Sequence, residues 1–183
     1  CFGFFLPPKG IFELLEAFEA AAFVNPALRL KLLNSLYDVR DSQRYVSECM
    51  RFIVQHRLAE RVVMCTDFLD QDTILKDLAA SDLIVLPYTW STESSSAAIR
   101  LPLASLTPVL CSDLDIFKEF AGTVHSYPAD DVVALANRIV ELSLDGALLR
   151  RFETEQRQYV NDLSWTNVAA QFQSVVEGCL RRS

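Results

Sequence analysis

The chain has 183 residues, a length that suits one domain. Hydrophobic residues make up 51% of it, which argues for a substantial core and against a disordered chain. The formal net charge of -7 argues against the broad basic surface that non-specific nucleic-acid binding needs, so we expect no nucleic-acid partner. One local basic pocket for a phosphate remains compatible with this charge.

The cysteines and histidines do not form a metal-binding pattern. None of the five cysteines belongs to a C-x-x-C pair, and only two histidines could join them, so we expect no metal site. The wide spacing of the cysteines fits reduced thiols in the core. The sequence also shows no membrane span and no signal peptide. We therefore expect a cytoplasmic protein. Because the chain opens on Cys1 as a strand without an initiator Met, we expect it to be an excised piece of a longer protein.

Short apolar segments, rich in Val, Leu and Ile, predict buried strands. In chain order they span residues 2–6, 28–34, 61–65, 83–86, 109–111 and 124–127. Segments with helical spacing of apolar residues lie between and after them. These span residues 9–22, 46–54, 72–80, 94–105, 132–142, 148–160 and 164–179, with a short helical turn at 116–120.

Two details of the helices are predicted as well. Asp70 or Asp72 is expected to cap the helix at 72–80. Trp165 is expected to pack the last helix, which Ser164 caps, onto the sheet.

Strands that are apolar on both faces and alternate with helices indicate a parallel sheet covered on both sides. We predict one α/β domain over 1–183, a Rossmann-like doubly wound parallel sheet of about six strands with helices on both faces. Ligands of such folds bind at the carboxyl ends of the strands, near the switch in strand order. Candidate functional residues should therefore follow strands directly.

Lys9 follows the first predicted strand at the point where a helix begins. There it can reach an anionic group, and the helix N-terminus adds partial positive charge and free N–H groups. A solvated lysine at a helix start is the alternative.

The run from Pro87 to Ala98 follows the fourth strand and is rich in hydroxyl groups. Small residues such as Ser94, Ser95 and Ser96 at a helix start let backbone N–H groups approach phosphate oxygens, and their side chains can donate too. Glu93 beside them suits hydrogen bonding to sugar hydroxyls. A helix cap is the alternative, although one cap needs only one such residue.

Two further places remain open between a functional and a structural role. Thr66 and Phe68, after the third strand, could form the wall of a base pocket or an ordinary loop. Arg100 is expected two turns beyond Glu93 on one helix. It could face a phosphate or a partner domain, or it could form a surface ion pair. Neither G-x-G-x-x-G nor a Walker A motif is present, so the dehydrogenase and P-loop classes lack their fingerprints.

Several segments resemble the C-terminal domain of group 1 (family 4) glycosyltransferases, which have the GT-B fold. The resemblance covers nearly the whole chain in order and spacing. The matching segments are the strand before Lys9-Gly10 and residues 61–69, 81–87, 108–110 and 163–165. The stretch 87–100 is most similar to a bacterial subgroup found with surface-polysaccharide genes.

The sequence departs from the family pattern at several positions. Glu93 matches the first acid of the family's E-x7-E pattern, but Leu101 stands at the second, which would hold ribose hydroxyls. Phe4 replaces an arginine that would clamp a phosphate. The family's glycines are replaced by Ser94–Ser96 and by residues 34–36. We therefore expect a variant donor pocket whose ribose contacts come from elsewhere, or weakened donor binding.

The resemblance implies a retaining glycosyltransferase of hexosyltransferase type. It would transfer sugar from a nucleotide-diphosphate donor, such as a UDP- or GDP-sugar, to a glycan or lipid-linked acceptor without a cofactor. Lys9 and the N–H groups of Ser94–Ser96 would neutralise the leaving diphosphate, and Glu93 would orient the donor sugar. Thr66, Phe68 and Arg100 are the further donor-site candidates.

The resemblance also implies a missing part. The chain 1–183 would be the donor-binding domain, inactive as an isolated fragment. An N-terminal acceptor domain absent from it would complete the cleft. The full-length protein would work in polysaccharide biosynthesis, with peripheral association at the inner face of the membrane as one option.

Two rival functions are kept. A non-catalytic GT-B-like scaffold or partner module fits the losses at Leu101 and Phe4. A dehydrogenase would also bind a nucleotide, but the strand at 2–6 has no glycine fingerprint after it.

Overall fold

The protein, as a computed structural model, is described over residues 1–37 and 39–180. Its strands form two three-stranded sheets, and all strand pairs are parallel. The first sheet has the order β1-β2-β3, with β1 at Phe2–Phe4, β2 at Leu30–Ser35 and β3 at Val62–Cys65. The second has the order β4-β5-β6, with β4 at Ile84–Leu86, β5 at Val109–Ser112 and β6 at His125–Tyr127.

The two sheets meet where β1 contacts β4. From this contact the strand order runs outward in both directions, which is the switch in order that defines a doubly wound fold. The predicted α/β class is therefore confirmed. The single sheet of about six strands is instead two hydrogen-bonded halves in contact.

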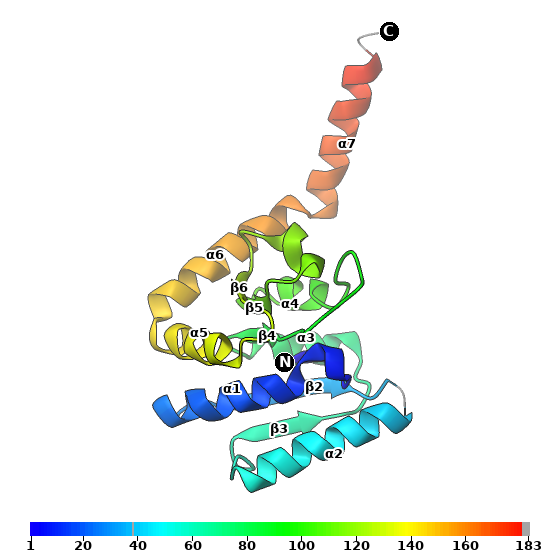
Figure 1. Cartoon of the computed structure of the whole chain (residues 1–183). Helices are drawn as coiled ribbons and strands as arrows, with labels where there is room; N and C mark the ends of the chain where they lie inside the picture. The colour runs from blue at the N-terminus through cyan, green and yellow to red at the C-terminus, as the bar shows by residue number, and fades with distance from the viewer. Residues whose placement is uncertain (38, 181–183) are drawn as a thin grey trace.

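Helices connect the strands and cover both faces (Figure 1). The α-helices are α1 at Ile11–Val24, α2 at Val39–Gln55, α3 at Gln71–Ala79, α4 at Arg100–Ala104, α5 at Val132–Leu144, α6 at Gly146–Asp162 and α7 at Trp165–Leu180. Two 3-10 helices, η1 at Pro7–Lys9 and η2 at Asp115–Phe120, follow β1 and β5. Of the two predicted caps for α3, Asp70 is the one used, since its Oδ1 accepts from the Thr73 N–H at 2.9 Å.

The apolar positions form two core clusters, one on each face of the sheets. One joins α1, α2 and α5 to the first face and includes Leu14, Leu32 and Ile139. The other joins α3, α4 and η2 to the opposite face and includes Leu78 and Phe117. Burial of these side chains is the main stabilising term of such a fold. It fixes the strand ends that carry the candidate site.

The predicted helix over 94–105 is wrong for its first half. Residues 94–99 are irregular, and α4 starts only at Arg100. Pro102 explains the late start, because proline is tolerated in the first helical turn but breaks the hydrogen-bond ladder further in. The preceding serines favour turns through local side-chain hydrogen bonds. Ser94–Ser96 therefore do not lie at a helix N-terminus, and Glu93 does not share a helix with Arg100.

The prediction for Trp165 is also wrong. Its side chain is 88% exposed, and α7 projects away from the rest of the domain (Figure 1). None of the residues of α7 is buried. The predicted apolar stripe is present but exposed, at Val168, Phe172, Val175 and Val176. Within the described part of the chain, no helix has the length and apolarity needed to span a bilayer.

The turn after β1 is docked tightly on the segment after β4. The Thr89 N–H donates to the Pro8 carbonyl at 3.1 Å. Gly10 has a φ of 67°, and a Cβ built there would lie 1.7 Å from the Pro87 carbonyl oxygen. Only glycine fits, because the contact leaves no room for a Cβ and the left-handed backbone disfavours one as well.

We predict that Gly10→Ala lowers the free energy of unfolding by about 2–5 kcal/mol. Left-handed strain accounts for about 1–2 kcal/mol of this and displacement of the Pro87 backbone for about 1–3 kcal/mol. Gly122→Ala is the matched control, because Gly122 has a φ of 86° but open space around its Cβ position. The control should lose only the strain contribution, about 1–2 kcal/mol. Equal losses in urea unfolding would contradict the docking constraint.

His125, at the start of β6, packs its ring against Phe152 of α6. The pKa of His125 is lowered from 6.5 to about 4, first by burial and then by the positive charge of Arg138, against smaller opposing contributions from Glu155 and Glu141. The folded protein therefore binds fewer protons than the unfolded chain between these two values, and stability falls as the pH drops through this range.

We expect His125→Gln to remove this contribution to the pH dependence. The difference in unfolding free energy between wild type and variant should be constant above pH 6.5 and shrink as the pH falls toward 4. Chemical denaturation at a series of pH values measures it. A difference that stays constant over the whole range would show that His125 protonates as easily in the folded state as in the unfolded chain.

Candidate functional site

Lys9 ends η1 at the switch point, between the carboxyl ends of β1 and β4. Its Nζ lies 3.9 Å from the centroid of the Tyr88 ring, a cation–π contact. Partial burial lowers the pKa of Lys9, and the negative charge of Glu93 opposes this shift. The structure thus brings together Lys9 and Glu93, which the sequence placed after different strands.

The segment after β4 carries two buried hydroxyls. Tyr88 is 2% exposed and Ser96 is 1% exposed, and neither side-chain oxygen has a partner in hydrogen-bond geometry. Burial raises the pKa of Tyr88 to about 12, while the neighbouring Ser96 hydroxyl partly offsets the rise. The two hydroxyls are thus close enough to influence each other but are not aligned as a hydrogen bond. Glu93 and Ser94 are exposed on the same segment.

Ser95 and Arg100 are both held by Glu119 of η2. The Ser95 hydroxyl donates to the Glu119 carboxylate, and the Arg100 guanidinium lies 3.6 Å from the same carboxylate oxygen. Both groups of the Arg100–Glu119 ion pair are largely exposed. Of the open alternatives for Arg100, the surface ion pair is the one the structure shows.

Thr66 and Phe68 follow β3 at the same edge, on the far side of β2 from Lys9. The Thr66 carbonyl accepts from the Leu36 N–H at 3.2 Å, which joins this loop to the end of β2. The Phe68 side chain is 84% exposed. The two residues therefore border the carboxyl edge but do not join the Lys9 group.

Several buried polar atoms near this edge of the sheets have no hydrogen-bond partner. Besides Tyr88 and Ser96, Asn34 of β2 and Ser112 of β5 hold buried side-chain polar atoms without a hydrogen-bond partner. Such atoms are rare in folded proteins and call for a ligand, a water or another explanation. Sequence reasoning missed Asn34, Tyr88 and Ser112 as site candidates. A polar residue near the end of an otherwise apolar strand was the available signal for Asn34 and Ser112.

The positions that depart from the family pattern have apolar surroundings. The Phe4 ring lies 5.0 Å from the Tyr37 ring, edge to face, where the family has an arginine. Leu101, at the place of the second acid, is half-buried against the core on the α3 and α4 side. Neither side chain can bind a phosphate or a ribose hydroxyl.

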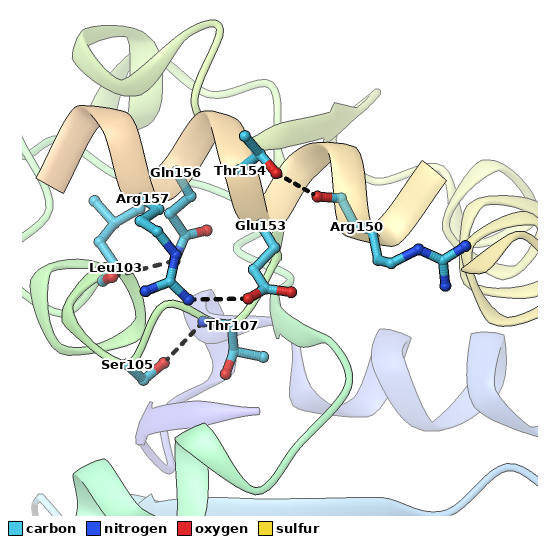
Figure 2. Close-up of polar contacts among 8 residues, drawn as sticks. All are labelled: Leu103, Ser105, Thr107, Arg150, Glu153, Thr154, Gln156 and Arg157. Atoms are coloured by element: carbon cyan, nitrogen blue, oxygen red, sulfur yellow. Dashed lines mark hydrogen bonds and ion pairs between the residues drawn. The ribbon is translucent and has the colours of Figure 1, made fainter. Parts of the chain in front are cut away.

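Partly open hollows lie at the opposite, amino edge of the sheets. One, of about 530 Å³, is lined by Asp82, Thr107, Arg150, Glu153 and Arg157 among others. In Figure 2 the side chains of Arg150 and Arg157 point away from each other, and Arg157 pairs with Glu153 at 3.0 Å. The other, of about 810 Å³, is lined by residues such as Lys31 and Arg61 that begin β2 or precede β3.

The candidate site is better placed at the carboxyl edge than in either hollow. Ligands of doubly wound sheets bind at the carboxyl ends of the strands. The desolvated lysine and the buried, unpartnered hydroxyls lie there too. Within the described residues, no His, Cys, Asp or Glu side chains gather in a group that could hold a metal ion.

No protein-family model matches the chain. A curated relative is the phosphatidyl-myo-inositol mannosyltransferase of Mycobacterium leprae, which is 35% identical over 88 residues. That match covers 46% of this chain and 24% of the mannosyltransferase.

Solved structures match over a larger part of the chain. Anabaena HepE in complex with UDP superposes with a TM-score of 0.78 and 20% identity, over 98% of this chain and 47% of HepE. The C-terminal domain of LpcC, a group 1 glycosyl transferase from Francisella tularensis, superposes with a TM-score of 0.78 and 16% identity. That match covers 88% of this chain and 83% of the LpcC domain.

The chain thus spans about a quarter of the mannosyltransferase and about half of HepE. The fold resemblance predicted from the sequence is confirmed by these superpositions. The chain has the fold of the C-terminal domain of GT-B glycosyltransferases.

Proposed function

We propose that the chain is the donor-binding domain of a glycosyltransferase that takes its sugar from a nucleotide diphosphate. The observation that carries this proposal is the meeting of Lys9, Glu93 and the buried Tyr88 at the switch point of the fold. HepE, which shares the fold, has been crystallised with UDP and with UDP-glucose. A UDP-sugar is therefore the donor to test first.

In the proposed reaction the bond between the anomeric carbon and the diphosphate oxygen breaks, and its electron pair stays on the diphosphate. Lys9 is placed to stabilise the negative charge that develops there. Exposed Glu93 would accept hydrogen bonds from hydroxyls of the donor sugar. The Ser94 side chain is exposed beside it and can donate to the phosphates, but the N–H groups of Ser94–Ser96 add no helix dipole because residues 94–99 are not helical.

The finer features of the reaction are proposals on the same basis. We infer a hexosyl group, transferred with retention to a glycan or lipid-linked acceptor whose hydroxyl proton passes to the departing diphosphate as the new bond forms. The anomeric configuration of the product, read by NMR, tests retention.

A second domain would bind the acceptor. The exposed apolar stripe of α7 supports this part of the proposal, because surfaces of this kind usually meet a partner. On this account an N-terminal acceptor domain packs against α7 and faces the carboxyl edge of the sheets. The isolated chain would then bind nucleotide but transfer no sugar.

A scaffold without catalysis is the second candidate function, and Leu101 and Phe4 favour it. Both lie where the family pattern has groups that bind the donor, and both have apolar contacts instead. This candidate predicts that the full-length protein binds no nucleotide sugar and shows no turnover.

Isothermal calorimetry with UDP and UDP-glucose tests the donor site. We expect Lys9→Met to weaken UDP binding about tenfold or more, because a charge-assisted hydrogen bond contributes about 1.5–3 kcal/mol. Lys31→Met is the matched control, since Lys31 pairs with Asp77 near the amino edge. If neither the chain nor the full-length protein binds UDP, GDP or their sugars, the donor-site proposal is wrong.

Glu93→Gln separates recognition of the sugar from recognition of the nucleotide. We expect this variant to weaken UDP-glucose binding while UDP binding stays the same or improves, because a nearby negative charge is lost. Glu60→Gln, an exposed acid just before β3 at the amino edge, is the control. Equal weakening of both ligands by Glu93→Gln would contradict the assigned role.

A further inference from the structure

Tyr88 lies at the centre of the contacts that build the switch point. It follows Pro87 at the end of β4 and is 2% exposed. Its ring meets the Phe117 ring edge to face at 5.1 Å, which fixes it against η2. The Lys9 ammonium lies over the same ring at 3.9 Å from the centroid.

The backbone around this pair leaves little freedom. The hydrogen bond between Thr89 and Pro8 and the close approach of Gly10 to Pro87 hold the two segments together. The main chain therefore holds the Lys9 and Tyr88 backbones close together, so that the ring lies within reach of the lysine side chain.

The Tyr88 ring contacts Lys9 without cancelling the positive charge of its ammonium group. Within the described ranges, no carboxylate lies within ion-pair distance of Lys9, and Glu93 acts on it only from further away. An aromatic face attracts an ammonium group without neutralising it, whereas a carboxylate partner would cancel its charge. A ring face accepts no conventional hydrogen bond, so the three N–H donors of the half-buried lysine are not used up by this contact.

We propose that Tyr88 is a positioning residue whose ring holds the Lys9 ammonium, still charged, where the diphosphate of the donor binds. The inference rests on the proposed function and gives Tyr88 a role in it. A flexible lysine loses rotamer freedom when it binds a ligand, and a ring that orders it beforehand removes that cost. The ring is therefore expected to strengthen binding of the diphosphate without contacting the ligand.

Two substitutions separate the ring from the hydroxyl. Tyr88→Leu removes both, whereas Tyr88→Phe keeps the ring and removes only an oxygen that has no hydrogen-bond partner. By calorimetry we expect Tyr88→Leu to weaken UDP binding about three- to thirtyfold, the range of a cation–π contact. Uridine, which lacks the diphosphate, should bind Tyr88→Leu as it binds the wild type. Tyr88→Phe should bind UDP like the wild type.

Two controls exclude a merely structural effect. Phe152→Leu, at a core aromatic of α6 that is 6% exposed and remote from the site, should leave the ratio of UDP to uridine affinity unchanged. In a Lys9→Met background, Tyr88→Leu should cause no further loss, because the ring then has no ammonium to position.

The outcomes distinguish this inference from the proposed function. A wild-type chain and full-length protein that bind no UDP would contradict both. Wild-type binding of UDP combined with an unchanged Tyr88→Leu would contradict the positioning role alone. So would an equal loss in Tyr88→Phe, an equal loss of uridine binding, or a loss that persists without Lys9.

Discussion

The docking of the β1–α1 turn onto the end of β4 is the constraint on which the candidate site depends. Gly10 lets the main chain approach the Pro87 carbonyl more closely than any side chain would permit. The hydrogen bond from the Thr89 N–H to the Pro8 carbonyl holds the same two segments together. Since β1 and β4 belong to different sheets, this contact also joins the two halves of the domain. This contact is what brings Lys9 and Glu93, which are far apart in the sequence, to the same place.

The electrostatics of the site follow from that geometry. The net charge of -7 repels anions from the protein as a whole, so a charged lysine at the switch point supplies the local attraction that an anionic ligand needs. Partial burial lowers the pKa of Lys9, whereas Glu93 favours the charged form. By contrast, Arg100 is paired with Glu119, which leaves it less able to bind a phosphate.

Most of the strands and helices could be predicted from the sequence, because the spacing of apolar residues reflects which side chains are buried. The strand-end rule for doubly wound sheets was enough to select Lys9 and Glu93, which the structure places close together. The helix predicted over 94–105 is wrong in its first half, because Pro102 and the serines before it favour a start at Arg100. The prediction that Trp165 packs onto the sheet is wrong for a different reason. Periodicity identifies an apolar face of a helix but does not say what covers that face. Tyr88 was missed because an aromatic residue after a strand is indistinguishable, in one sequence, from an ordinary core residue.

The most direct test is to locate where UDP binds. Amide chemical-shift changes during a UDP titration, followed by heteronuclear NMR, would map the site without any substitution. We expect the largest changes on residues 9–10 and 88–96, at the carboxyl edge of the sheets. Changes centred instead on the hollow beside Arg150 and Arg157, or no changes in either the chain or the full-length protein, would contradict it.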